Sequence, residues 1–448
     1  MQNLSVNIPP SNKPRVVIVG GGFGGINTVK ALNSDDFQIV LVDKHNYHTF
    51  QPLLYQVASA GLEPDAIAGP LRKALNKKKD FYFRMLRVTG INPEANTITT
   101  SAGDMAYDYL VISNGTKSNF FGNDEMQKLS LPLKTVPDAL NIRSHLMQLF
   151  EWANLVNDAG LKEKMMTIVI VGGGPTGVET AGALAELRKY VLPKDYPQLD
   201  FNQMKIYLLE GLDRVLPPMS EKASASAKRN LEKMGVIIKN STMVESYNGE
   251  VVTLKGGEQI KALTVLWTAG VAGDLLPGLK KEWAEKSRLL TDENCRILGS
   301  HNIFAIGDVA LMKTDKYPKG HPGVAQPAIQ MGKYVGKNLK NLHHKQPVKP
   351  FKYFDKGSLA TIGRGKAVAD LPGNIHLTGR IAWWIWLFVH VTFLISFRNK
   401  MMVLATWLWN YFTFDKGNRL IIRPYIRKDT TYINAQELVS GVETSGQQ

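Results

Sequence analysis

Cysteine is nearly absent from this chain, which has Cys295 as its only cysteine. A lone thiol cannot close a disulfide within the chain, so a disulfide framework and a two-cysteine redox centre are both excluded. Scarce cysteine also fits a reducing compartment, where disulfides rarely persist.

Two features of exported or ion-pumping proteins are also missing. Residues 1–15 contain no apolar core of signal-peptide length, so we expect a short tail there and a body that stays on the side where it is made. No transmembrane path of ionisable residues is visible. Proton pumping is therefore not expected.

Acidic side chains are in the minority, with 54 Lys and Arg against 39 Asp and Glu and a net charge of +15. Such an excess favours an acidic partner, namely an anionic membrane, a phosphorylated ligand or nucleic acid, or it serves solubility alone. No nucleic-acid-binding motif accompanies the charge, so we expect no nucleic acid partner.

Glycine is abundant, and two stretches use it in the same way. At 15–47 and again at 165–190, an apolar strand runs into GGGxxG and then into a helix. Continuous apolar runs of this kind are typical of central strands in a parallel sheet. The pattern predicts an α/β fold with two Rossmann-like dinucleotide-binding domains in one chain.

The first loop has Gly20, Gly22 and Gly25 in the pattern G-x-G-x-x-G. The first glycine permits the tight turn, the second lets a pyrophosphate approach the backbone, and the third lets the helix and strand pack closely. Asp43 lies 23 residues after Gly20, where an acid that binds the ribose is expected. A purely structural glycine turn is the alternative.

The second loop repeats the pattern with Gly172, Gly174 and Gly177, and the strand that follows ends at Glu210. A carboxylate there binds the ribose hydroxyls of NADH and repels the 2′-phosphate of NADPH, so NADH is the expected nucleotide. Arg214 is close enough in the sequence to weaken that preference.

Two dinucleotide sites suggest two dinucleotides, one held permanently and one exchanging. A bound flavin that accepts hydride from a nicotinamide nucleotide is the simplest pair. Because hydride transfer between stacked rings needs little acid–base assistance, we expect positioning groups and no catalytic triad.

Eight segments carry a family resemblance. They are GGGFGG at 20–25, NYHTFQPLLYQVASAGL at 46–62, YLVISNGT at 109–116, GGGPTGVE at 172–179, LWTAGV at 266–271, IFAIGDVA at 303–310, AQPAIQMG at 325–332 and YFDKGSLATIG at 353–363. Each occurs in other flavoproteins, but their order and spacing are specific. Over nearly all of residues 14–415 the chain resembles the type II NADH:quinone oxidoreductases, flavoproteins with a glutathione-reductase-like fold.

The resemblance implies roles for matched residues. Asp308 is similar to the aspartate that hydrogen-bonds the ribityl–phosphate region of FAD, with a helix N-cap as its alternative role. Gly115 and Thr116 resemble a second turn that contacts the flavin, and Val88 resembles a position whose backbone touches adenine. Further cofactor-binding positions carried over in the same way are Gly307, Ala325 and Gly270.

Three residues resemble the family's catalytic positions. Glu179 is similar to the glutamate between the nicotinamide and quinone pockets, although a carboxylate early in a helix also stabilises the helix dipole. Gln326 and Gln330 are four residues apart and share one helix face, which in the family lies beneath the flavin and lines the quinone tunnel. An ordinary solvated helix is the alternative for the two glutamines.

The implied enzyme is a non-proton-pumping NADH:quinone oxidoreductase. It holds FAD tightly, takes hydride from NADH, and passes two electrons to a quinone whose protons come from water or a nearby carboxylate. The family leaves a homodimer open. The expected domains are a first FAD-binding segment at 14–125, an NAD(H)-binding domain at 126–290, a second FAD-binding segment at 291–375, an amphipathic membrane anchor at 376–430 and a polar tail at 431–448.

Competing interpretations differ in acceptor or in class. Sulfide:quinone oxidoreductases and disulfide reductases need paired cysteines, which a chain with one cysteine lacks. A soluble NAD(P)H-dependent reductase of another acceptor keeps the double fold but gives no reason for the apolar stretch near the C-terminus. An NADH-binding regulatory protein needs neither that stretch nor the tunnel glutamines.

The apolar stretch at 380–412 contains five of the eight tryptophans. Its first run, 381–397, has 17 residues, about 25 Å as a helix, which is at the lower edge for crossing a hydrocarbon layer of about 30 Å. Each run carries a narrow polar stripe, which favours lying in the membrane interface over crossing it. The stripes are Thr392, Ser396 and Asn399, then Thr406, Asn410 and Thr413.

Cations flank both apolar runs and suit anionic headgroups, while tryptophan suits the same depth. These cations are Arg398, Lys400, Lys416, Arg419, Arg423, Arg427 and Lys428. We therefore expect a peripheral, monotopic membrane protein on the cytoplasmic face of a bacterial inner membrane, with the anchor holding the quinone tunnel against the lipid. A single spanning helix and a buried core helix or dimer contact are the alternatives.

Overall fold

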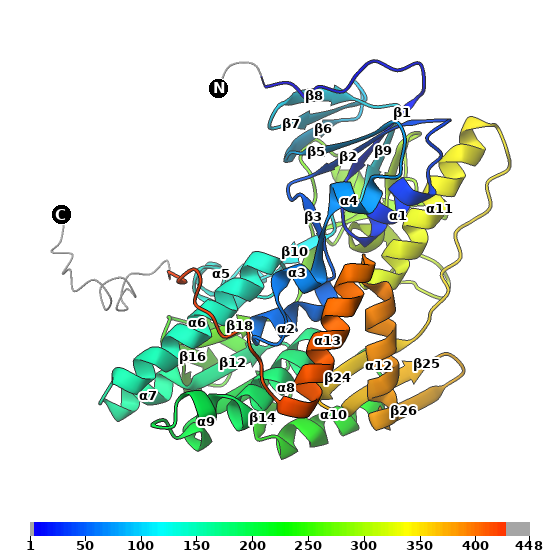
Figure 1. The fold of residues 1–448 in the computed structure, drawn as a ribbon. Helices are drawn as coiled ribbons and strands as arrows, with labels where there is room; N and C mark the ends of the chain where they lie inside the picture. The colour runs from blue at the N-terminus through cyan, green and yellow to red at the C-terminus, as the bar shows by residue number, and fades with distance from the viewer. Residues whose placement is uncertain (1–3, 427–448) are drawn as a thin grey trace. The chain divides into compact units, whose positions relative to one another are not determined.

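The computed structural model describes residues 4–426, which form two compact units (Figure 1). Unit 1 comprises the chain up to Thr49, Ala68–Lys117 and Val271–Lys356; unit 2 comprises Phe50–Ile67, Ser118–Gly270 and the chain from Gly357 onward. The segments 50–67 and 357–375 therefore belong to unit 2, whereas the predicted domains grouped them with the FAD-binding segments. The polar tail at 431–448, together with Arg427 and Lys428, lies outside the described residues.

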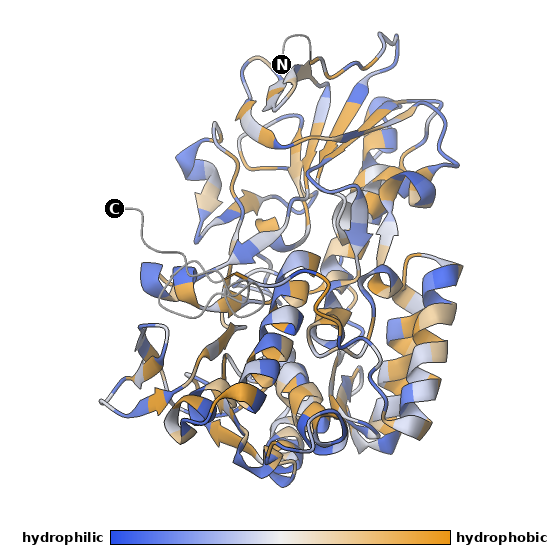
Figure 2. Ribbon diagram, turned by 60° about the vertical axis from the view of Figure 1, so that its left-hand side comes forward, coloured by the Kyte–Doolittle hydropathy of each residue, from blue (hydrophilic) through white to orange (hydrophobic). Residues whose placement is uncertain are grey.

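Unit 1 is built on a five-stranded parallel sheet of order β22-β9-β1-β2-β5. Its strands are β22 (Ile303–Ala305), β9 (Tyr109–Ile112), β1 (Arg15–Val19), β2 (Gln38–Asp43) and β5 (Phe81–Met85). The central strands β1 and β2 are largely hydrophobic, as their orange colour in Figure 2 shows. All residues of β1 except Arg15 and all of β2 except Asp43 are buried. A parallel sheet of this kind needs cover on both faces.

One face of unit 1 carries two helices that pack closely. They are α1 (Phe23–Ala31) and α11 (Ala325–His343). A Cβ at Gly332 would lie 2.3 Å from the carbonyl oxygen of Gly24, and one at Gly336 would lie 2.9 Å from that of Thr28. The two glycines, four residues apart, let the helix backbones approach. The helix that follows the first glycine loop is thereby fixed.

The remaining elements of unit 1 are short. They are β3 (Tyr47–Thr49), β4 (Ala68–Pro70), α4 (Leu71–Leu75), β6 (Val88–Asn92), β7 (Thr97–Thr100), β8 (Gly103–Ala106), β19 (Val271–Gly273), η3 (Lys281–Trp283), β20 (Ala284–Glu285), β21 (Arg288–Thr291), η4 (Gly307–Val309) and β23 (Ala310–Met312). Strands β6, β7 and β8 form an antiparallel meander.

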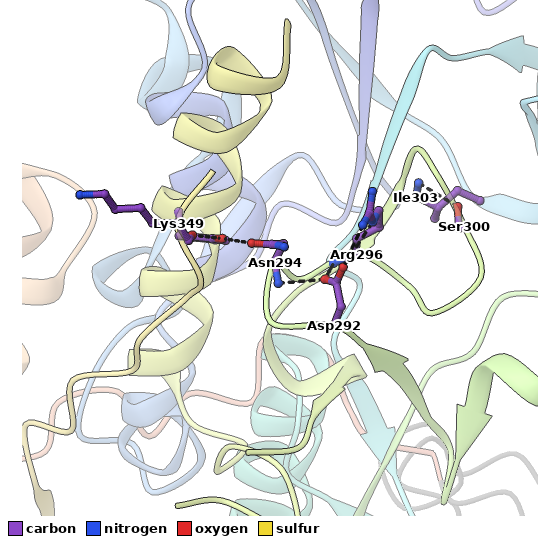
Figure 3. A network of polar contacts seen from close by, with 7 residues as sticks. Asp292, Asn294, Arg296, Ser300, Ile303 and Lys349 are labelled. Atoms are coloured by element: carbon purple, nitrogen blue, oxygen red, sulfur yellow. Dashed lines mark hydrogen bonds and ion pairs between the residues drawn. The ribbon is translucent and has the colours of Figure 1, made fainter. Parts of the chain in front are cut away.

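A polar turn precedes β22 and contains the only cysteine (Figure 3). The Asp292 carboxylate accepts hydrogen bonds from the backbone of Asn294 and Arg296 at 2.8 and 2.9 Å. The Tyr334 hydroxyl on α11 donates to Asn294 Oδ1 at 2.7 Å and to the Lys349 carbonyl at 2.5 Å. The turn therefore ties α11 and the segment after it to the sheet.

Unit 2 repeats the plan with a five-stranded parallel sheet of order β11-β18-β12-β13-β14. Its strands are β11 (Leu131–Pro132), β18 (Thr264–Trp267), β12 (Thr167–Val171), β13 (Lys205–Leu209) and β14 (Val236–Lys239). The other bounds are α2 (Leu54–Ala58), α3 (Pro64–Ile67), α5 (Asp124–Leu129), α6 (Val136–Leu155), α7 (Ala159–Met165), α8 (Pro175–Tyr190), α9 (Leu192–Asp195), α10 (Glu221–Lys233), β15 (Val244–Tyr247), β16 (Val251–Leu254) and β17 (Gln259–Lys261).

The two sheets correspond strand by strand. In each sheet the central strand, β1 or β12, leads into a glycine loop and a helix. The next strand along the chain, β2 or β13, pairs on one side of it. The strand on its other side, β9 or β18, follows a three-stranded meander. The sequence prediction of an α/β fold with two Rossmann-like halves is confirmed.

The C-terminal part of unit 2 adds an antiparallel sheet and two helices. These are β24 (Ser358–Gly363), β25 (Lys366–Leu371), β26 (Ile375–Gly379), α12 (Arg380–Phe393) and α13 (Phe397–Thr413). The predicted single run at 381–397 is wrong as a helix, because α12 ends at Phe393 and the Ser396 side chain caps α13 by accepting from the Asn399 backbone at 3.2 Å. None of the helices among the described residues is both long and apolar enough to span a membrane.

Candidate functional site

The two glycine loops have the same backbone geometry. Gly20 and Gly172 have φ of +102° and +107°, a region that glycine tolerates and other residues avoid. A Cβ on Gly25 would lie 1.9 Å from the Gly20 carbonyl oxygen, and one on Gly177 would lie 1.9 Å from that of Gly172. The first and third glycines are therefore required by the turn and by close helix packing.

The second glycine of each loop is different. A Cβ on Gly22 or on Gly174 would meet nothing within 4 Å, and each residue precedes the first turn of a helix, α1 or α8. Open space at a helix N-terminus is where a pyrophosphate is accommodated, since free N–H groups and the helix dipole favour an anion. The chain thus leaves room for a phosphate at both predicted positions.

The two predicted ribose acids hold these loops in the same way. Asp43 accepts hydrogen bonds from the backbone N–H groups of Gly21 at 2.5 Å and His45 at 2.7 Å. Glu210 accepts from Gly173 at 2.6 Å and Leu212 at 2.8 Å. Each carboxylate oxygen has a second lone pair, so both acids can still accept from ribose hydroxyls.

The turn of unit 1 that is predicted to contact the flavin contains unsatisfied polar atoms. The Thr116 hydroxyl and Asn114 Oδ1 are buried without a hydrogen-bond partner in the described structure. Gly115, between them, has φ of +74° and nothing within 4 Å of a built Cβ. Buried polar groups are seldom left unpaired, so this turn fits a bound polar ligand such as FAD.

The other predicted flavin positions lie at element ends of unit 1. Gly307 and Asp308 form η4, with Gly307 at φ +70°, and Ala325 begins α11. A Cβ on Gly323 would lie 3.6 Å from Asp308 Cγ, so the aspartate faces the segment that leads into α11. Val88 begins β6 and is buried against the core.

In unit 2, local contacts account for the conformations of two residues singled out by the sequence, Gly270 and Arg214. A Cβ on Gly270 would lie 2.6 Å from the Phe121 ring, and the residue has φ of +72°. The Arg214 guanidinium donates to the Pro217 carbonyl at 3.1 Å, while its buried Nη1 has no partner in the described structure.

A cavity of about 110 Å³ lies within unit 2 between α2, α8, β24, α12 and α13. Gly182 on α8 makes it possible, because a Cβ there would lie 1.9 Å from the Ile362 carbonyl oxygen on β24. Glu179 and Glu186, on either side of Gly182, accept hydrogen bonds from the backbone of Thr361 at 3.3 Å and Arg364 at 2.5 Å. Both glutamates line the cavity.

Glu179 is buried, with 7% of its surface exposed. Burial raises the pKa of its carboxyl to about 8. The hydrogen bond from Thr361 and the nearby Trp386 indole act in the opposite direction and lower that pKa. The Trp386 indole N–H makes no hydrogen bond of normal geometry in the described structure. The carboxyl is therefore mostly protonated at neutral pH. A protonated carboxyl facing a cavity can donate a proton. The alternative role of Glu179, stabilising the helix dipole, would not require such a proton.

The predicted tunnel glutamines in unit 1 bind backbone. Gln330 donates to the Phe354 carbonyl at 2.8 Å and accepts from the Phe354 N–H at 3.0 Å, and Gln326 accepts from Lys356 N–H at 3.2 Å. Both amides therefore hold the segment after residue 350 against α11. The alternative of an ordinary solvated helix face does not describe these two side chains.

The sequence assigned no role to two histidines that the structure buries: His390 lay off the polar stripe and was unexplained, and His48 was not considered separately. His48 contacts the Gly21 carbonyl oxygen through Nδ1 at 3.0 Å, and His390 contacts that of Trp386 at 2.7 Å while stacking on its indole. Burial lowers the pKa of each imidazole to about 4, so both are neutral at pH 7. The quoted segment at 46–62 contained His48, but only the fold brings it to the first loop.

Cys295 does not behave as a redox thiol. It is fully buried in the turn of Figure 3, and burial raises its pKa well above the ordinary value. A reactive thiol needs the opposite environment.

Two parallel dinucleotide sheets, each with a glycine loop and an acid, define an α/β oxidoreductase that uses pyridine nucleotide and flavin. A family model described as pyridine nucleotide-disulphide oxidoreductase matches residues 14–332, and the NDH2 C-terminal domain matches 356–414. The chain belongs to the type II NADH:quinone oxidoreductases. The resemblance predicted from the eight segments is confirmed.

Named relatives and structures support this assignment. The type II NADH:quinone oxidoreductase NdhA of Mycobacterium tuberculosis is 36% identical over 425 residues, which cover 91% of this chain and 89% of that one. A Staphylococcus saprophyticus relative of the same name is 30% identical, covering 81% and 91%. The NDH2 of Plasmodium falciparum, solved in complex with NADH, shares the fold with a TM-score of 0.84 at 23% identity, covering 92% and 100%.

Proposed function

We propose that this protein oxidises NADH and passes two electrons through FAD to a membrane quinone, without pumping protons. The observation that carries the proposal is the matched pair of loop–carboxylate sites in a chain of this family. One site serves the resident cofactor and the other the exchanging nucleotide. FAD, when bound, supplies the hydride acceptor and the two-electron donor.

The residues of unit 1 fit the FAD. Gly22 leaves space for its pyrophosphate, Asp43 accepts from its ribose, and Thr116 and Asn114 have unpaired polar atoms. Gly307, Asp308 and Ala325 occupy the matched family positions. In unit 2, Gly174 and Glu210 do for NADH what Gly22 and Asp43 do for FAD, and Glu210 disfavours the 2′-phosphate of NADPH by charge repulsion.

Glu179 holds a proton at neutral pH and releases it as quinone is reduced. Its burial is the support for this role, since the raised pKa matches a general acid near physiological pH. We assign Gln326 and Gln330 to the quinone side, where their contacts with 354–356 keep the tunnel wall in place.

The apolar stretch is proposed to lie on an anionic membrane surface. Helices α12 and α13 lie side by side (Figure 1), and their outer side chains are exposed. We call these the outer apolar face: Ile381, Trp384, Phe388, Phe397, Met401, Leu408, Trp409 and Phe412, each at least 49% exposed. A patch of this kind marks a membrane or protein contact.

Two residues of the predicted polar stripes, Asn399 and Asn410, contact the protein itself. Asn399 is 3% exposed and donates to the carbonyls of Asp65 and Ala66 at 2.7 and 2.9 Å, while Asn410 donates to that of Gly61 at 3.3 Å. The stripe on α13 therefore docks the helix onto its own unit, which leaves the apolar side outward. The outward apolar side of α13 supports binding to a membrane surface, although these two polar residues do not face that surface as an interfacial stripe would.

Two predicted headgroup cations also turn inward. Lys416 donates to the Ala183 carbonyl at 3.0 Å, and Arg419 pairs with Asp195 at 2.5 Å and Asp415 at 3.1 Å. Arg398 and Arg423 are exposed, while Arg398 pairs with Asp65 at 3.0 Å and Arg423 donates to Asn141 Oδ1 at 2.7 Å. The cytoplasmic face of a bacterial membrane is the proposed location, where NADH is made and disulfides are rare.

Purified protein tests the function directly. We expect a yellow, FAD-containing sample that oxidises NADH with a short-chain quinone, faster than with NADPH and without thiol reagents. Absence of bound flavin, or turnover with a dithiol or ferredoxin but not with quinone, would contradict the proposal.

Vesicle flotation tests the membrane contact. Replacing Trp384, Phe388 and Trp409 with serine should abolish binding to phosphatidylglycerol vesicles and leave short-chain quinone activity intact. A second copy of this chain is the competing occupant. If the serine variant still floats with the vesicles but no longer sediments as a dimer, the outer apolar face is a homodimer interface.

A further inference from the structure

One end of the unit 2 cavity contains a cation with no role in the proposed electron transfer. Arg364 follows β24 and lines the cavity. Its Nη1 is buried without a hydrogen-bond partner, and the guanidinium makes no ion pair with any residue that the structure describes. Because arginine stays charged in proteins, this end of the cavity holds a persistent positive charge.

Two aromatic rings lie against the Arg364 guanidinium. Its central carbon lies 4.2 Å from the Tyr411 ring centroid and 4.0 Å from that of Phe414, which in turn stacks on Tyr190 at 4.2 Å. Phe414 has φ of +57°, an unfavourable conformation for a bulky residue. Contact with a ring does not use the N–H groups at the edge of the guanidinium, and Nη1 remains available to an in-plane acceptor.

The nearest carboxylate at this end is already engaged. Glu186 accepts from the backbone N–H of Arg364 at 2.5 Å, and its other oxygen lies 4.0 Å from the Lys416 amine. Lys416 also lines the cavity. Arg364 and Lys416 thus line this end of the cavity together with one carboxylate, that of Glu186. An anionic ligand would neutralise the remaining positive charge.

Much of the remaining cavity wall is aromatic or aliphatic, and its polar members include Gln56, Ser59, Thr361 and Asn410. Trp383 and Trp386 come from α12 and Trp407 from α13, the helices whose outer sides form the outer apolar face. Glu179 lies seven residues before Glu186 on α8, about 10 Å along the helix axis. The cationic end is therefore separate from the buried carboxyl assigned to proton donation.

We propose that this cavity binds an anionic amphiphile, with its carboxylate or phosphate head on Arg364 and its acyl chain along the tryptophans. The unpaired guanidinium accounts for the head and the aromatic wall for the chain. A membrane lipid and a free fatty acid share this chemistry. The ligand is recognised by its charge, which a quinone lacks, although Glu179 lines another part of the same cavity.

Tryptophan fluorescence tests the proposal, since brominated chains quench indoles that they touch. Dibrominated stearate, added below its micelle concentration without vesicles, should bind the wild-type protein about tenfold or more tightly than dibrominated stearyl alcohol, as expected for one charge-assisted, bidentate contact. Arg364→Gln should reduce the affinity for stearate to that for the alcohol. Arg398→Gln, which removes an exposed cation of α13 outside the cavity, should leave both affinities unchanged.

The outcomes separate the alternatives. Equal binding of acid and alcohol by the wild type assigns the cavity to a neutral ligand and overturns the proposal, as does equal stearate binding by wild type and Arg364→Gln. Dodecyl phosphate should displace the stearate, and inorganic phosphate should not; equal displacement by inorganic phosphate would show a free-anion site and also overturn it. If Arg364→Gln fails to fold, Arg364→Lys should still weaken stearate binding, and unchanged affinity there counts against the proposal.

Discussion

Glu210 accepts a hydrogen bond at 2.6 Å from the backbone N–H of Gly173, 37 residues earlier in the chain. Asp43 stands in the same relation to Gly21 in the other sheet. Each acid therefore has two functions, because it fixes the loop that surrounds the phosphate and presents a carboxylate to the ribose.

Glu210→Gln should weaken discrimination between NADH and NADPH by about tenfold, the value of one charge-assisted hydrogen bond. The amide oxygen can still accept from Gly173, which retains that loop contact. The charge is lost, and so is the hydrogen bond from Leu212, because the amide NH2 group cannot accept it. The measurement is the ratio of kcat/KM for the two nucleotides. Asp43→Asn is the matched control, which should lower FAD content and leave that ratio unchanged; an unaltered ratio in Glu210→Gln would remove Glu210 from the ribose role.

Gly174→Val should raise the KM for NADH by about tenfold or more without unfolding the protein. Nothing lies within 4 Å of a Cβ at this position, so the side chain enters only the space assigned to the pyrophosphate. Gly22→Val should instead deplete FAD. Thermal unfolding should be near wild type for both proteins, and normal NADH kinetics in Gly174→Val would mean that the nucleotide binds elsewhere.

Glu179→Gln should change how stability depends on pH. The folded protein keeps this proton up to about pH 8, whereas the ordinary pKa is 4.5, so wild-type stability falls as pH rises between these values. The glutamine variant lacks that decline and should be more stable at pH 9 by on the order of 3–5 kcal/mol, with little difference at pH 4. Urea unfolding at both pH values checks this, and parallel pH curves would mean that Glu179 is ionised in the folded state.

The same substitution should slow quinone reduction at neutral pH, because an amide cannot donate the proton. Flavin reduction by NADH should continue at the wild-type rate. Equal slowing of both half-reactions would contradict the assignment of Glu179 to the quinone step.

Gln330→Ala should slow oxidation of the reduced enzyme by quinone severalfold more than its reduction by NADH. The substitution also removes two hydrogen bonds to Phe354, worth about 1 kcal/mol each, so some loss of stability is expected. Tyr334→Phe supplies the control, since it loosens the same connecting segment at Lys349 from the same helix. If Tyr334→Phe slows quinone oxidation as much, the effect of Gln330 comes from the segment and not from the tunnel.

The loops were predictable because their requirements are local. Gly20, Gly25 and their counterparts follow from backbone conformation and close packing, which the spacing of glycines reveals. The contact between Glu210 and Gly173 was not predictable, since it joins residues that only the sheet brings together. The cavity depends on the same kind of long-range packing, with Gly182 and β24 as its determinants.

The C-terminal helices show where periodicity misleads. The spacing of Asn399 and Asn410 correctly indicated a polar stripe, but spacing does not say what a stripe faces. Both side chains bind backbone carbonyls of unit 2, and the apolar side is the exposed one. The expected helix is interrupted at Ser396. Its side chain accepts a hydrogen bond from the Asn399 backbone N–H, three residues later, and thereby caps α13.

Anaerobic stopped-flow measurement of the two half-reactions tests the central claim most directly. NADH should bleach the flavin absorbance of the purified protein, and a short-chain quinone in the second mix should restore it, each at least as fast as steady-state turnover. Flavin that NADH reduces but quinone leaves reduced would contradict this account of the protein.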